Sequence, residues 1–451
     1  MNKPRIIIAA LKSGSGKTTI TCGLLSALKN MGLNPCSFKC GPDYIDPMFH
    51  RNVLGIPAGN LDTFFTEDEV TKGLFYNEFQ GDIAVIEGVM GLYDGVAGIQ
   101  ETGSTYDLAR VLKAPIVLVV DAKGAGRSLI AEIKGFLDYD KHGLIKGVIL
   151  NKTNTAFGKI VGDLIEKELG VAYLGTLPMD DSLRVDSRHL GLVIPEEIDY
   201  LKEKINTVGE LISQNIDMAL VKKIANSSEE LGIIKEDKGL GLGKSQNVYT
   251  DLNLAVARDN AFCFYYKENL SMLTRAGVQL RYFSPINDEK LPDNIKGILL
   301  GGGYPENYLE QLSENQSMKQ AIKNAYESGV PILAECGGFM YLLDSITDKE
   351  GNVYEMVGAI NGAASWTGKL VRFGYATFSD DDTSIKGHEF HYFDSNNNGE
   401  DMLAQKPSSN RSWKCIHKVG ASYIGFPHMY YPSNPEFLIN FVEAMKNYGA
   451  N

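Results

Sequence analysis

The sequence predicts two α/β domains, the first built around a doubly wound parallel β-sheet, with a charged helical segment between them. Two stretches indicate this fold class, and both have the order apolar strand, glycine-containing turn, helix. The first stretch covers residues 5–29 and the second covers residues 332–343. Strands buried on both faces of a parallel sheet are continuous apolar runs, and ligands bind at the carboxyl ends of such strands. Functional residues are therefore expected in the turns that follow the strands.

The composition limits the classes of function. The chain has 451 residues, 44% of them hydrophobic, and a net charge of −12. This length allows two or three domains with their own cores, and the acidic balance argues against nucleic acid or an anionic membrane as partner. The six cysteines have no disulfide-scaffold spacing. No signal peptide opens the chain and no apolar run approaches the roughly 20 residues of a transmembrane helix, so a cytoplasmic protein is expected.

A phosphate-binding loop is predicted between the first strand and the helix that follows it. The strict pattern has glycine where this chain has Leu11, and the loop resembles the deviant form, with an extra lysine five residues before Lys17. In such loops backbone N–H groups surround the phosphates of ATP, the lysine reaches the β- and γ-phosphates, and the next hydroxyl, here Thr18, binds Mg²⁺. The predicted nucleotide-binding residues of the loop are Lys12, Ser13, Gly14, Ser15, Gly16, Lys17, Thr18 and Thr19.

Strands and helices continue to alternate through residues 82–88, 114–121 and 147–152, which predicts a doubly wound parallel sheet. Two polar side chains stand at the ends of these strands. Glu87 is placed to hold Mg²⁺, directly or through water, and Asn151 is placed to bond the edge of an adenine ring. The alternative for each is a role in a turn or a helix cap. The nearby phosphate-binding loop favours the functional role for Glu87.

Two unusual loops follow the second strand and Glu87. Residues 39–47 read KCGPDYIDP, and residues 88–95 read GVMGLYDG. Acidic side chains beside a nucleotide site can hold a metal ion or meet the carboxylate of an acceptor. The glycines of the second loop allow the backbone to approach a large ligand.

A nucleophile elbow is predicted at Cys336. The cysteine lies between an apolar strand and a helix, with Ala334 two residues before it and Gly338 two residues after it. Because a helix N-terminus lowers the pKa of a thiol, a thiolate nucleophile is expected. The alternative is a structural cysteine buried before a glycine turn.

Two further stretches supply the partners that a thiol nucleophile needs. Residues 301–303 are three glycines that follow an apolar strand, and such a turn can present the N–H groups of an oxyanion hole. A histidine far downstream suits the base, because the base of a catalytic cysteine is usually distant in sequence. The predicted catalytic pair is Cys336 and His428, and the predicted oxyanion hole is Gly302, Gly303 and Gly337.

The order oxyanion loop, cysteine elbow, distant histidine resembles a class I glutamine amidotransferase domain. The resemblance implies hydrolysis of glutamine through a thioester, with release of ammonia. One position departs from the pattern, because the glutamate expected two residues after the histidine is Tyr430 here. The group that orients His428 is therefore missing or comes from elsewhere in the chain.

A second resemblance covers nearly the whole chain. The phosphate-binding loop, KCGPDYIDP at 39–47, VIEGVMGLYDG at 85–95, RHLGL at 188–192 and GHEFHY at 387–392 are together similar to the cobyrinic acid a,c-diamide synthase family. The resemblance implies amidation of the a and c acetate groups of a corrinoid ring through acyl phosphates formed from ATP. It places Asp43 and Glu87 on the side of the metal. It assigns contacts with the substrate to Tyr44, Ile45, Asp46 and Asp94.

These features divide the chain into three parts. They are a P-loop ATP-binding domain (1–194), a helical and flexible linker (195–250) and a glutamine amidotransferase domain (251–451). Residues 235–243, rich in lysine and glycine, are typical of a flexible linker, and residues 354–360 and 369–378 indicate antiparallel β structure. The expected ligands are ATP, Mg²⁺, glutamine and the corrinoid, and a homodimer is one option for the assembly.

Two alternatives to this function stay open at this point. The same chemistry on hydrogenobyrinic acid or nickel-sirohydrochlorin fits the motifs, because they do not separate these rings. A dimeric P-loop ATPase switch, like the septum-site and partition proteins, would suit Lys12. The switch gives no role to the cysteine elbow or to the triple glycine.

Overall fold

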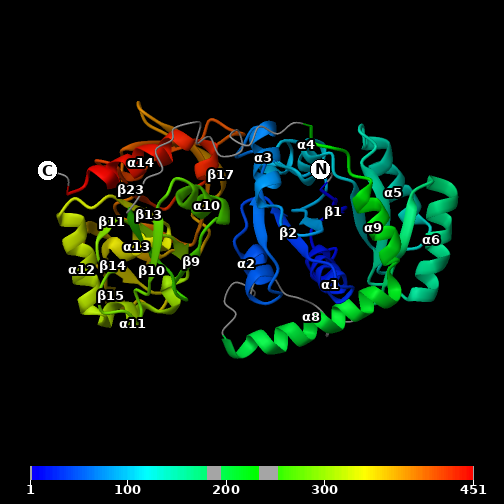
Figure 1. The fold of residues 1–451 in the computed structure, drawn as a ribbon, viewed down its shortest axis with the longest axis horizontal. Helices are drawn as coiled ribbons and strands as arrows, with labels where there is room; N and C mark the ends of the chain where they lie inside the picture. The colour runs from blue at the N-terminus through cyan, green and yellow to red at the C-terminus, as the bar shows by residue number, and fades with distance from the viewer. Residues whose placement is uncertain (1–2, 180–194, 233–251, 450–451) are drawn as a thin grey trace. The chain divides into compact units, whose positions relative to one another are not determined.

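The computed structural model describes residues 3–179, 195–232 and 252–449. Backbone contacts divide the chain into two compact units, Met1–Gly239 (unit 1) and Leu240–Asn451 (unit 2). Figure 1 shows unit 1 from blue to green and unit 2 from green to red. The predicted motif at 188–192 and the predicted linker segment at 235–243 lie outside the described residues.

Unit 1 is built on a seven-stranded sheet in the order β3-β2-β4-β1-β5-β6-β7. Each neighbouring pair is parallel. The predicted doubly wound sheet is therefore confirmed, and the strands that the apolar runs predicted start and end within two residues of the observed bounds. The strands are β1 (Arg5–Ala10), β2 (Pro35–Cys40), β3 (Ala58–Leu61), β4 (Ile83–Glu87), β5 (Ile116–Asp121), β6 (Ile145–Asn151) and β7 (Ala172–Leu177).

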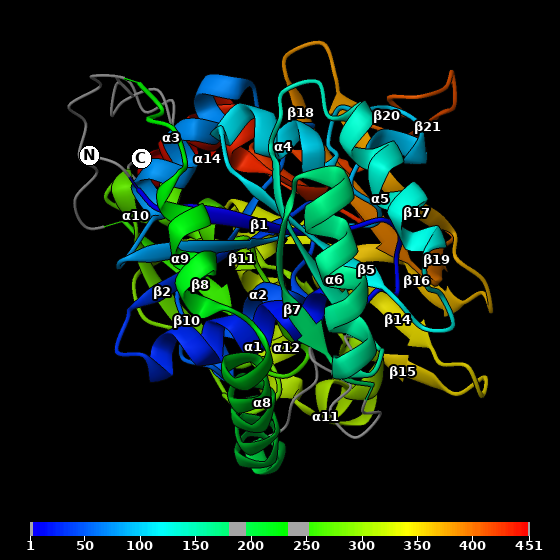
Figure 2. The same ribbon diagram turned by 90° about the vertical axis from the view of Figure 1, so that its right-hand side faces the viewer.

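Helices cover both faces of this sheet. Figure 2 shows α5 and α6 side by side, and these two helices are in contact. The helices of unit 1 are α1 (Lys17–Asn30), α2 (Ile45–Asn52), α3 (Asp68–Glu78), α4 (Thr105–Leu112), α5 (Ser128–Tyr139), α6 (Thr155–Leu169), α8 (Pro195–Asn215) and α9 (Met218–Asn226).

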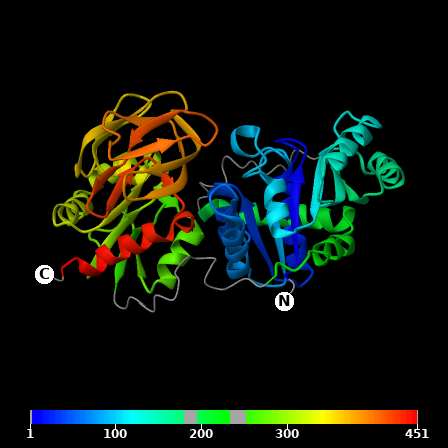
Figure 3. The ribbon, with the colours of Figure 1, turned by 90° about the horizontal axis from the view of Figure 1, so that it is seen from above.

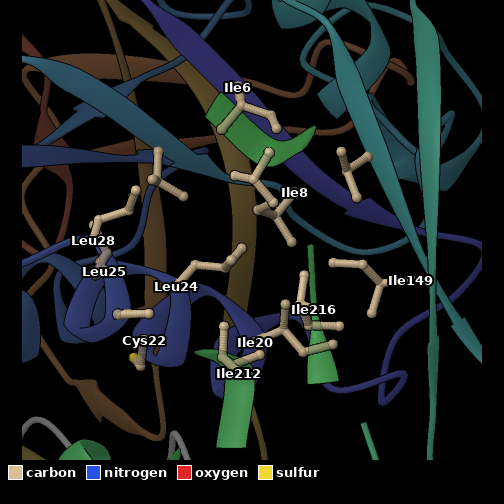
Figure 4. Close-up of a cluster of buried hydrophobic side chains, with 14 of the residues drawn as sticks. Ile6, Ile8, Ile20, Cys22, Leu24, Leu25, Leu28, Ile149, Ile212 and Ile216 are labelled. Atoms are coloured by element: carbon tan, nitrogen blue, oxygen red, sulfur yellow. The ribbon is translucent and has the colours of Figure 1, made fainter. Parts of the chain in front are cut away.

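The main core of unit 1 lies between the sheet and the helices α1, α8 and α9. In Figure 4 the side chains of Ile6 and Ile8 face those of Leu24 on α1 and Ile212 on α8. Gly23 allows α1 and α8 to approach closely, because a Cβ atom there would lie 2.8 Å from Cγ1 of Ile212. Full burial of an aliphatic side chain contributes about 1.5–3 kcal/mol, so this layer stabilises the sheet that carries the phosphate-binding loop.

Helices α8 and α9 fall within the stretch that the sequence assigns to a linker. In the structure they belong to unit 1, where Ile205, Val208 and Ile212 of α8 are fully buried against it. The helical pattern was correctly read from the sequence. The sequence does not predict which surface buries the apolar face of α8, because helical periodicity identifies an apolar face but not the surface that it packs against.

Unit 2 contains a six-stranded sheet in the order β10-β8-β11-β13-β23-β22, parallel except for β22. Its strands are β8 (Asn253–Ala257), β10 (Gln279–Phe283), β11 (Ile295–Leu300), β13 (Ile332–Glu335), β22 (His417–Val419) and β23 (Ser422–Gly425). The accompanying helices are α10 (Lys267–Arg275), α11 (Leu309–Glu314), α12 (Gln316–Glu327), α13 (Gly337–Leu342) and α14 (Pro435–Asn447). A second α/β fold is therefore confirmed.

The remaining strands of unit 2 form smaller sheets, and Figure 3 shows the yellow and orange strands on the side away from the red helix α14. Their pairs are antiparallel apart from β14–β16. The β-rich prediction holds for residues 369–378, and residues 354–360 are only partly in strands. These strands are β9 (Phe262–Phe264) with β12 (Gly302–Gly303); β14 (Leu343–Thr347), β15 (Val353–Glu355), β16 (Ile360–Trp366) and β19 (Phe393–Ser395); β17 (Arg372–Ser379), β18 (Ser384–His391), β20 (Met402–Gln405), β21 (Ser412–Cys415) and β24 (His428–Met429).

The packing of α8 generates a first prediction. Replacing Ile212 by Ala removes buried methyl groups from the layer between α1 and α8, so the free energy of unfolding of unit 1 should fall by about 2–4 kcal/mol. Urea denaturation of the full chain, followed by far-UV circular dichroism, measures the change. The control is Gln214→Ala, which alters an exposed position of the same helix. Equal midpoints for the two variants would show that α8 does not pack on unit 1 in solution.

Candidate active sites

The phosphate-binding loop of unit 1 joins β1 to α1. It turns through Gly16, whose φ of 95° lies in the left-handed region that glycine adopts readily, and α1 begins at Lys17. Two side chains from the end of β6 hold the loop. The side-chain amide of Asn151 donates to the carbonyl of Ser15 at 2.8 Å, and Nζ of Lys152 donates to the carbonyl of Gly14 at 2.7 Å. The loop is therefore fixed before any nucleotide binds.

The position of Asn151 bears on its predicted contact with adenine. A Cβ atom at Gly16 would lie 2.3 Å from Nδ2 of Asn151, so only glycine leaves room for this amide beside the loop. Oδ1 of Asn151 accepts from the N–H of Lys152 at 3.0 Å. The side chain thus stabilises the loop itself, and its contact with a base stays a prediction.

The lysine of the loop rests on the second glycine-rich loop. Nζ of Lys17 donates to the carbonyl of Met90 at 2.5 Å. Burial and the neighbouring ammonium of Lys39 lower the pKa of Lys17 to about 8. Asp94 shapes the same glycine-rich loop, because its Oδ2 accepts from the N–H of Gly91 at 2.9 Å. The phosphate-binding loop and the glycine-rich loop at 88–95 are therefore in contact through the ammonium group of Lys17, which is predicted to reach the phosphates.

Thr18 and Glu87, two of the three residues predicted to bind magnesium with Asp43, are in direct contact. Oγ1 of Thr18 donates to Oε1 of Glu87 at 2.6 Å, and Nζ of Lys39 donates to the same oxygen at 2.9 Å. Glu87 is fully buried, and within the described part of the chain its Oε2 has no hydrogen-bond partner. Burial raises the pKa of Glu87 to about 7, and the charge of Asp46 adds to the effect.

This arrangement fits a magnesium ion. A buried carboxylate oxygen that accepts no hydrogen bond from the described residues, beside the hydroxyl of Thr18, matches the oxygen ligands that Mg²⁺ prefers. Across the three described ranges, no group of three or more His, Cys, Asp or Glu side chains could hold a metal ion by itself. Magnesium at nucleotide sites takes one or two protein ligands and completes its shell with phosphate oxygens and water. Thr18 and Glu87 are the residues that would hold it.

A buried cluster of charges surrounds Lys39. Its Nζ lies 2.5 Å from Oδ2 of Asp46 and 4.0 Å from Oδ2 of Asp43. These carboxylates hold the pKa of Lys39 well above its usual range, against the effect of burial. Asp43 lies two residues before α2, and its Oδ1 accepts from the N–H groups of Ile45 and Asp46 in the first turn at 2.8 and 3.1 Å. Both carboxylate oxygens of Asp43 therefore already have neighbours: Oδ1 accepts from the two N–H groups, and Oδ2 lies near the ammonium of Lys39. Its binding of metal stays a prediction.

The residues assigned to the substrate lie around the same cluster. Tyr44 and Asp46 are buried, whereas Ile45 and Asp94 are partly exposed. Asp46 neutralises Lys39 in this state, so its contact with an acceptor stays a prediction. Lys12, Ser13 and Gly14 are exposed at the mouth of the loop.

Cys336 of unit 2 stands on the predicted elbow between β13 and α13. Its φ of 49° and ψ of −102° are unusual for a residue with a side chain, and such strain collects at functional sites. The tight turn depends on Gly338, because a Cβ atom there would lie 2.2 Å from the carbonyl oxygen of Leu300. Cys336 is only partly buried as a residue, and its role as a nucleophile stays a prediction.

The predicted partners of Cys336 converge on the elbow. The N–H of Cys336 donates to the carbonyl of Gly425 at 2.8 Å, which brings the strand before His428 beside β13. A Cβ atom at Gly302 would lie 2.5 Å from Cε1 of His428. A Cβ atom at Gly337 would lie 3.4 Å from the backbone nitrogen of Gly303. The glycines predicted for the oxyanion hole therefore border both the nucleophile turn and the imidazole.

The predicted thiolate is corrected by the structure. Burial raises the pKa of Cys336 well above its usual range, and the carboxylates of Glu306, Glu389 and Glu335 raise it further. The N–H of Gly337 lowers it, but by less. Helix α13 has only six residues, so its dipole does not outweigh these effects. The Cys336 side chain is therefore a thiol at rest, and a nucleophilic role would require a base that removes its proton.

The surroundings of His428 include residues that sequence reasoning missed. The ring of His388 stacks on that of His428 with centroids 4.9 Å apart, and the hydroxyl of Tyr266 bonds Nδ1 of His388 at 3.1 Å. Nδ1 of His428 lies 3.8 Å from Oε2 of Glu335. In the sequence, His388 is part of the GHEFHY motif, and Glu335 directly precedes Cys336. These two positions were the available indications that the residues belong to the site. Lys39 is the first residue of the motif KCGPDYIDP, but the sequence did not indicate that its side chain is buried.

The fold and these sites define the class of protein. One chain carries a P-loop nucleotide-binding unit and a second α/β unit in which a strand–turn–helix elbow with Cys336 lies beside the strand that leads to His428. Two family models match it: the CobQ/CobB/MinD/ParA nucleotide binding domain over residues 6–193, and the CobB/CobQ-like glutamine amidotransferase domain over residues 253–425.

Full-length relatives place the chain more narrowly. It is similar to the cobyrinate a,c-diamide synthases of Fusobacterium nucleatum (39% identity, 96% of this chain and 98% of the relative), Picrophilus torridus (40%, 98% and 99%) and Clostridium acetobutylicum (40%, 97% and 99%). The chain belongs to the cobyrinate a,c-diamide synthase family. Within the described residues, no helix is both long and apolar enough to cross a membrane.

The carboxylate of Glu306 generates a second prediction. Burial raises the pKa of Glu306 to about 7, so it is ionised at pH 8, where its charge raises the pKa of the Cys336 thiol. Glu306→Gln removes this charge, and alkylation of Cys336 by iodoacetamide at pH 8 should become about 3- to 10-fold faster. At pH 6 the difference should shrink, because Glu306 is then protonated in the unmodified protein. Mass spectrometry of the peptide that contains Cys336 measures the rate.

The control for this experiment is Glu310→Gln, at an exposed position of the nearby helix α11. It should leave the alkylation rate unchanged at both pH values. Equal rates for the Glu306 variant and the unmodified protein at pH 8 would contradict the charge effect.

Proposed function

We propose that the protein amidates the a and c acetate carboxylates of cobyrinic acid, using ATP to form acyl phosphates and glutamine as the source of ammonia. The observation that carries the proposal is the presence of two complementary sites in one chain, Thr18 against Glu87 and Cys336 beside the strand leading to His428. The names of its relatives support the choice of acceptor. A dimeric ATPase switch would leave the second site without a role.

In unit 1 the chemistry is activation of a carboxylate. A carboxylate is a poor electrophile, and transfer of the γ-phosphoryl group from ATP to one of its oxygens converts that oxygen into part of a phosphate leaving group. The loop N–H groups and Lys17 bind and orient the phosphates in this proposal. Mg²⁺, when bound at Thr18 and Glu87, supplies neutralisation of phosphate charge. Ammonia then forms the C–N bond and phosphate departs.

In unit 2 the chemistry is release of ammonia from glutamine. His428 takes the proton of the Cys336 thiol, and the sulfur forms a bond with the carbon of the side-chain amide. The N–H groups of Gly302, Gly303 and Gly337 are assigned to the negative oxygen of the tetrahedral intermediate. The proton on His428 passes to the departing nitrogen, so ammonia leaves unprotonated and a thioester remains for water to hydrolyse. A base is essential because the thiol is protonated at rest.

The acceptor is tested by mass spectrometry. Cobyrinic acid incubated with the protein, ATP, Mg²⁺ and glutamine should undergo two conversions of acid to amide. Lys17→Ala should produce neither, because the phosphates of ATP lose their cationic partner. Parallel incubations with hydrogenobyrinic acid and nickel-sirohydrochlorin test the alternative rings. Turnover of another ring without turnover of cobyrinic acid would overturn the assignment.

The division between the two units gives a further prediction. Cys336→Ser should lower glutamine-dependent amidation at least about 100-fold, because an alcohol is a far weaker nucleophile than a thiolate. Activity with added ammonium salts should be spared. The control is Cys263→Ser, which changes the other partly exposed cysteine of unit 2 and should retain both activities. Equal loss with both nitrogen donors in the Cys336 variant would refute the division of labour.

A further inference from the structure

The position that usually orients the base of such an amidotransferase site departs from the pattern in this chain. A catalytic imidazole needs a group that fixes its ring and its tautomer, and the third member of a triad has this role. Position 430, where a glutamate is expected, holds a tyrosine in this chain. Tyr430 is fully buried and packs edge-on against the ring of Tyr266 at 5.1 Å. It supplies no negative charge to His428.

A buried carboxylate lies beside the imidazole from another direction. Oε2 of Glu335 is 3.8 Å from Nδ1 of His428, and both side chains are almost completely buried. The other oxygen of the carboxylate is held by the segment that follows the histidine. Oε1 of Glu335 accepts from the N–H of Met429 at 3.3 Å and from the hydroxyl of Tyr431 at 3.5 Å. One oxygen anchors the carboxylate, and the other faces the imidazole.

We propose that Glu335 replaces the missing third residue and positions His428 as the base for the Cys336 thiol. This inference rests on the proposed function of unit 2. A contact of 3.8 Å is longer than a hydrogen bond, and such contacts in a resting site commonly shorten when substrate binds. Glu335 touches neither the thiol nor the amide, so it is a positioning residue.

The charge of Glu335 matters at one step of the reaction. When the proton of the Cys336 thiol moves to Nε2 of His428, the ring becomes a cation that keeps its hydrogen on Nδ1. The carboxylate of Glu335 then accepts from Nδ1–H and stabilises the imidazolium with an opposite charge in a buried setting. No other reactant is needed, and the proton later leaves with the ammonia.

The group on the face of the imidazole cannot take this role. His388 stacks on His428 at an interplanar angle of 15°, which restricts the tilt of the ring. Burial, His428 and Lys406 hold the pKa of His388 well below its usual range, so His388 is neutral. A neutral ring adds little repulsion when its neighbour becomes charged. His388 therefore restricts the plane of the base, and Glu335 supplies the charge.

The place of Glu335 in the chain couples base and nucleophile. It directly precedes Cys336 at the end of β13, where it pairs with Gly425 of β23. A shift of the elbow would therefore move the carboxylate together with the sulfur. In the expected triad pattern the carboxylate comes two residues after the histidine. In this chain the carboxylate near the imidazole comes instead from the end of β13, the strand that leads to Cys336.

The test compares Glu335→Gln with the unmodified full-length protein. Glutamine at 335 keeps an oxygen that can accept from Met429 and Tyr431 but carries no charge. Glutamine-dependent kcat should fall at least about 10-fold with little change in KM for glutamine, because the charge acts after the thiol loses its proton. The acid limb of the kcat profile should move to lower pH by roughly one unit, since the imidazolium loses its counter-charge. Activity with ammonium salts should be unchanged.

Tyr431→Phe is the matched variant, because it removes the hydroxyl that anchors Glu335 and leaves the carboxylate charged. Its loss of glutamine-dependent kcat should be smaller than about threefold. An equal loss in both variants, or a loss with ammonium as well, would show that Glu335 only supports the local structure and would overturn the proposal. Normal kcat in Glu335→Gln would also overturn it. If the unmodified protein does not use glutamine, the proposed function fails and this inference fails with it.

Discussion

The pairing of β13 with β23 is the contact on which the amidotransferase site depends. It joins the strand that ends at Cys336 to the strand that leads to His428, and the N–H of Cys336 closes the pair on the carbonyl of Gly425. Because the bonds are between backbone groups, they hold Cys336 and the segment that leads to His428 at one edge of the sheet, whatever side chains surround them. The glycines at 302 and 337 then leave the space that the ring and the elbow occupy.

The candidate nucleotide site of unit 1 depends on one buried ammonium group, that of Lys39. Lys39 lies between the carboxylates of Asp46 and Glu87, and all three side chains are almost completely buried. A buried charge is costly unless it is paired, so these groups hold one another in place. Glu87 also accepts from Thr18, the second residue of α1. The charge cluster thereby connects the strand β2 and the loop that follows it to the phosphate-binding loop.

Local patterns were sufficient for the strands and for both functional turns. Continuous apolar runs predicted β1, β5 and β13, because strands buried on both faces have no polar alternation. The turns at Gly16 and Cys336 were recognisable because each contains a glycine, Gly16 or Gly338, at a position where a side chain would not fit. The thiolate was not predictable in the same way. The pKa of Cys336 depends on burial and on Glu306 and Glu389, which lie far from it in sequence.

Sequence alone determined the order of the elements and the family to which the chain is similar, and it indicated where the two candidate sites lie. Tertiary structure decided which groups act on one another. In the folded protein α8 packs in the core of unit 1, and the side chain of Asn151 donates to the phosphate-binding loop. Glu335 lies beside His428. The physical reason is that strand order and side-chain burial arise from contacts between distant parts of the chain. A motif records which residues stand next to one another in sequence, whereas charge, pKa and reach depend on neighbours in space.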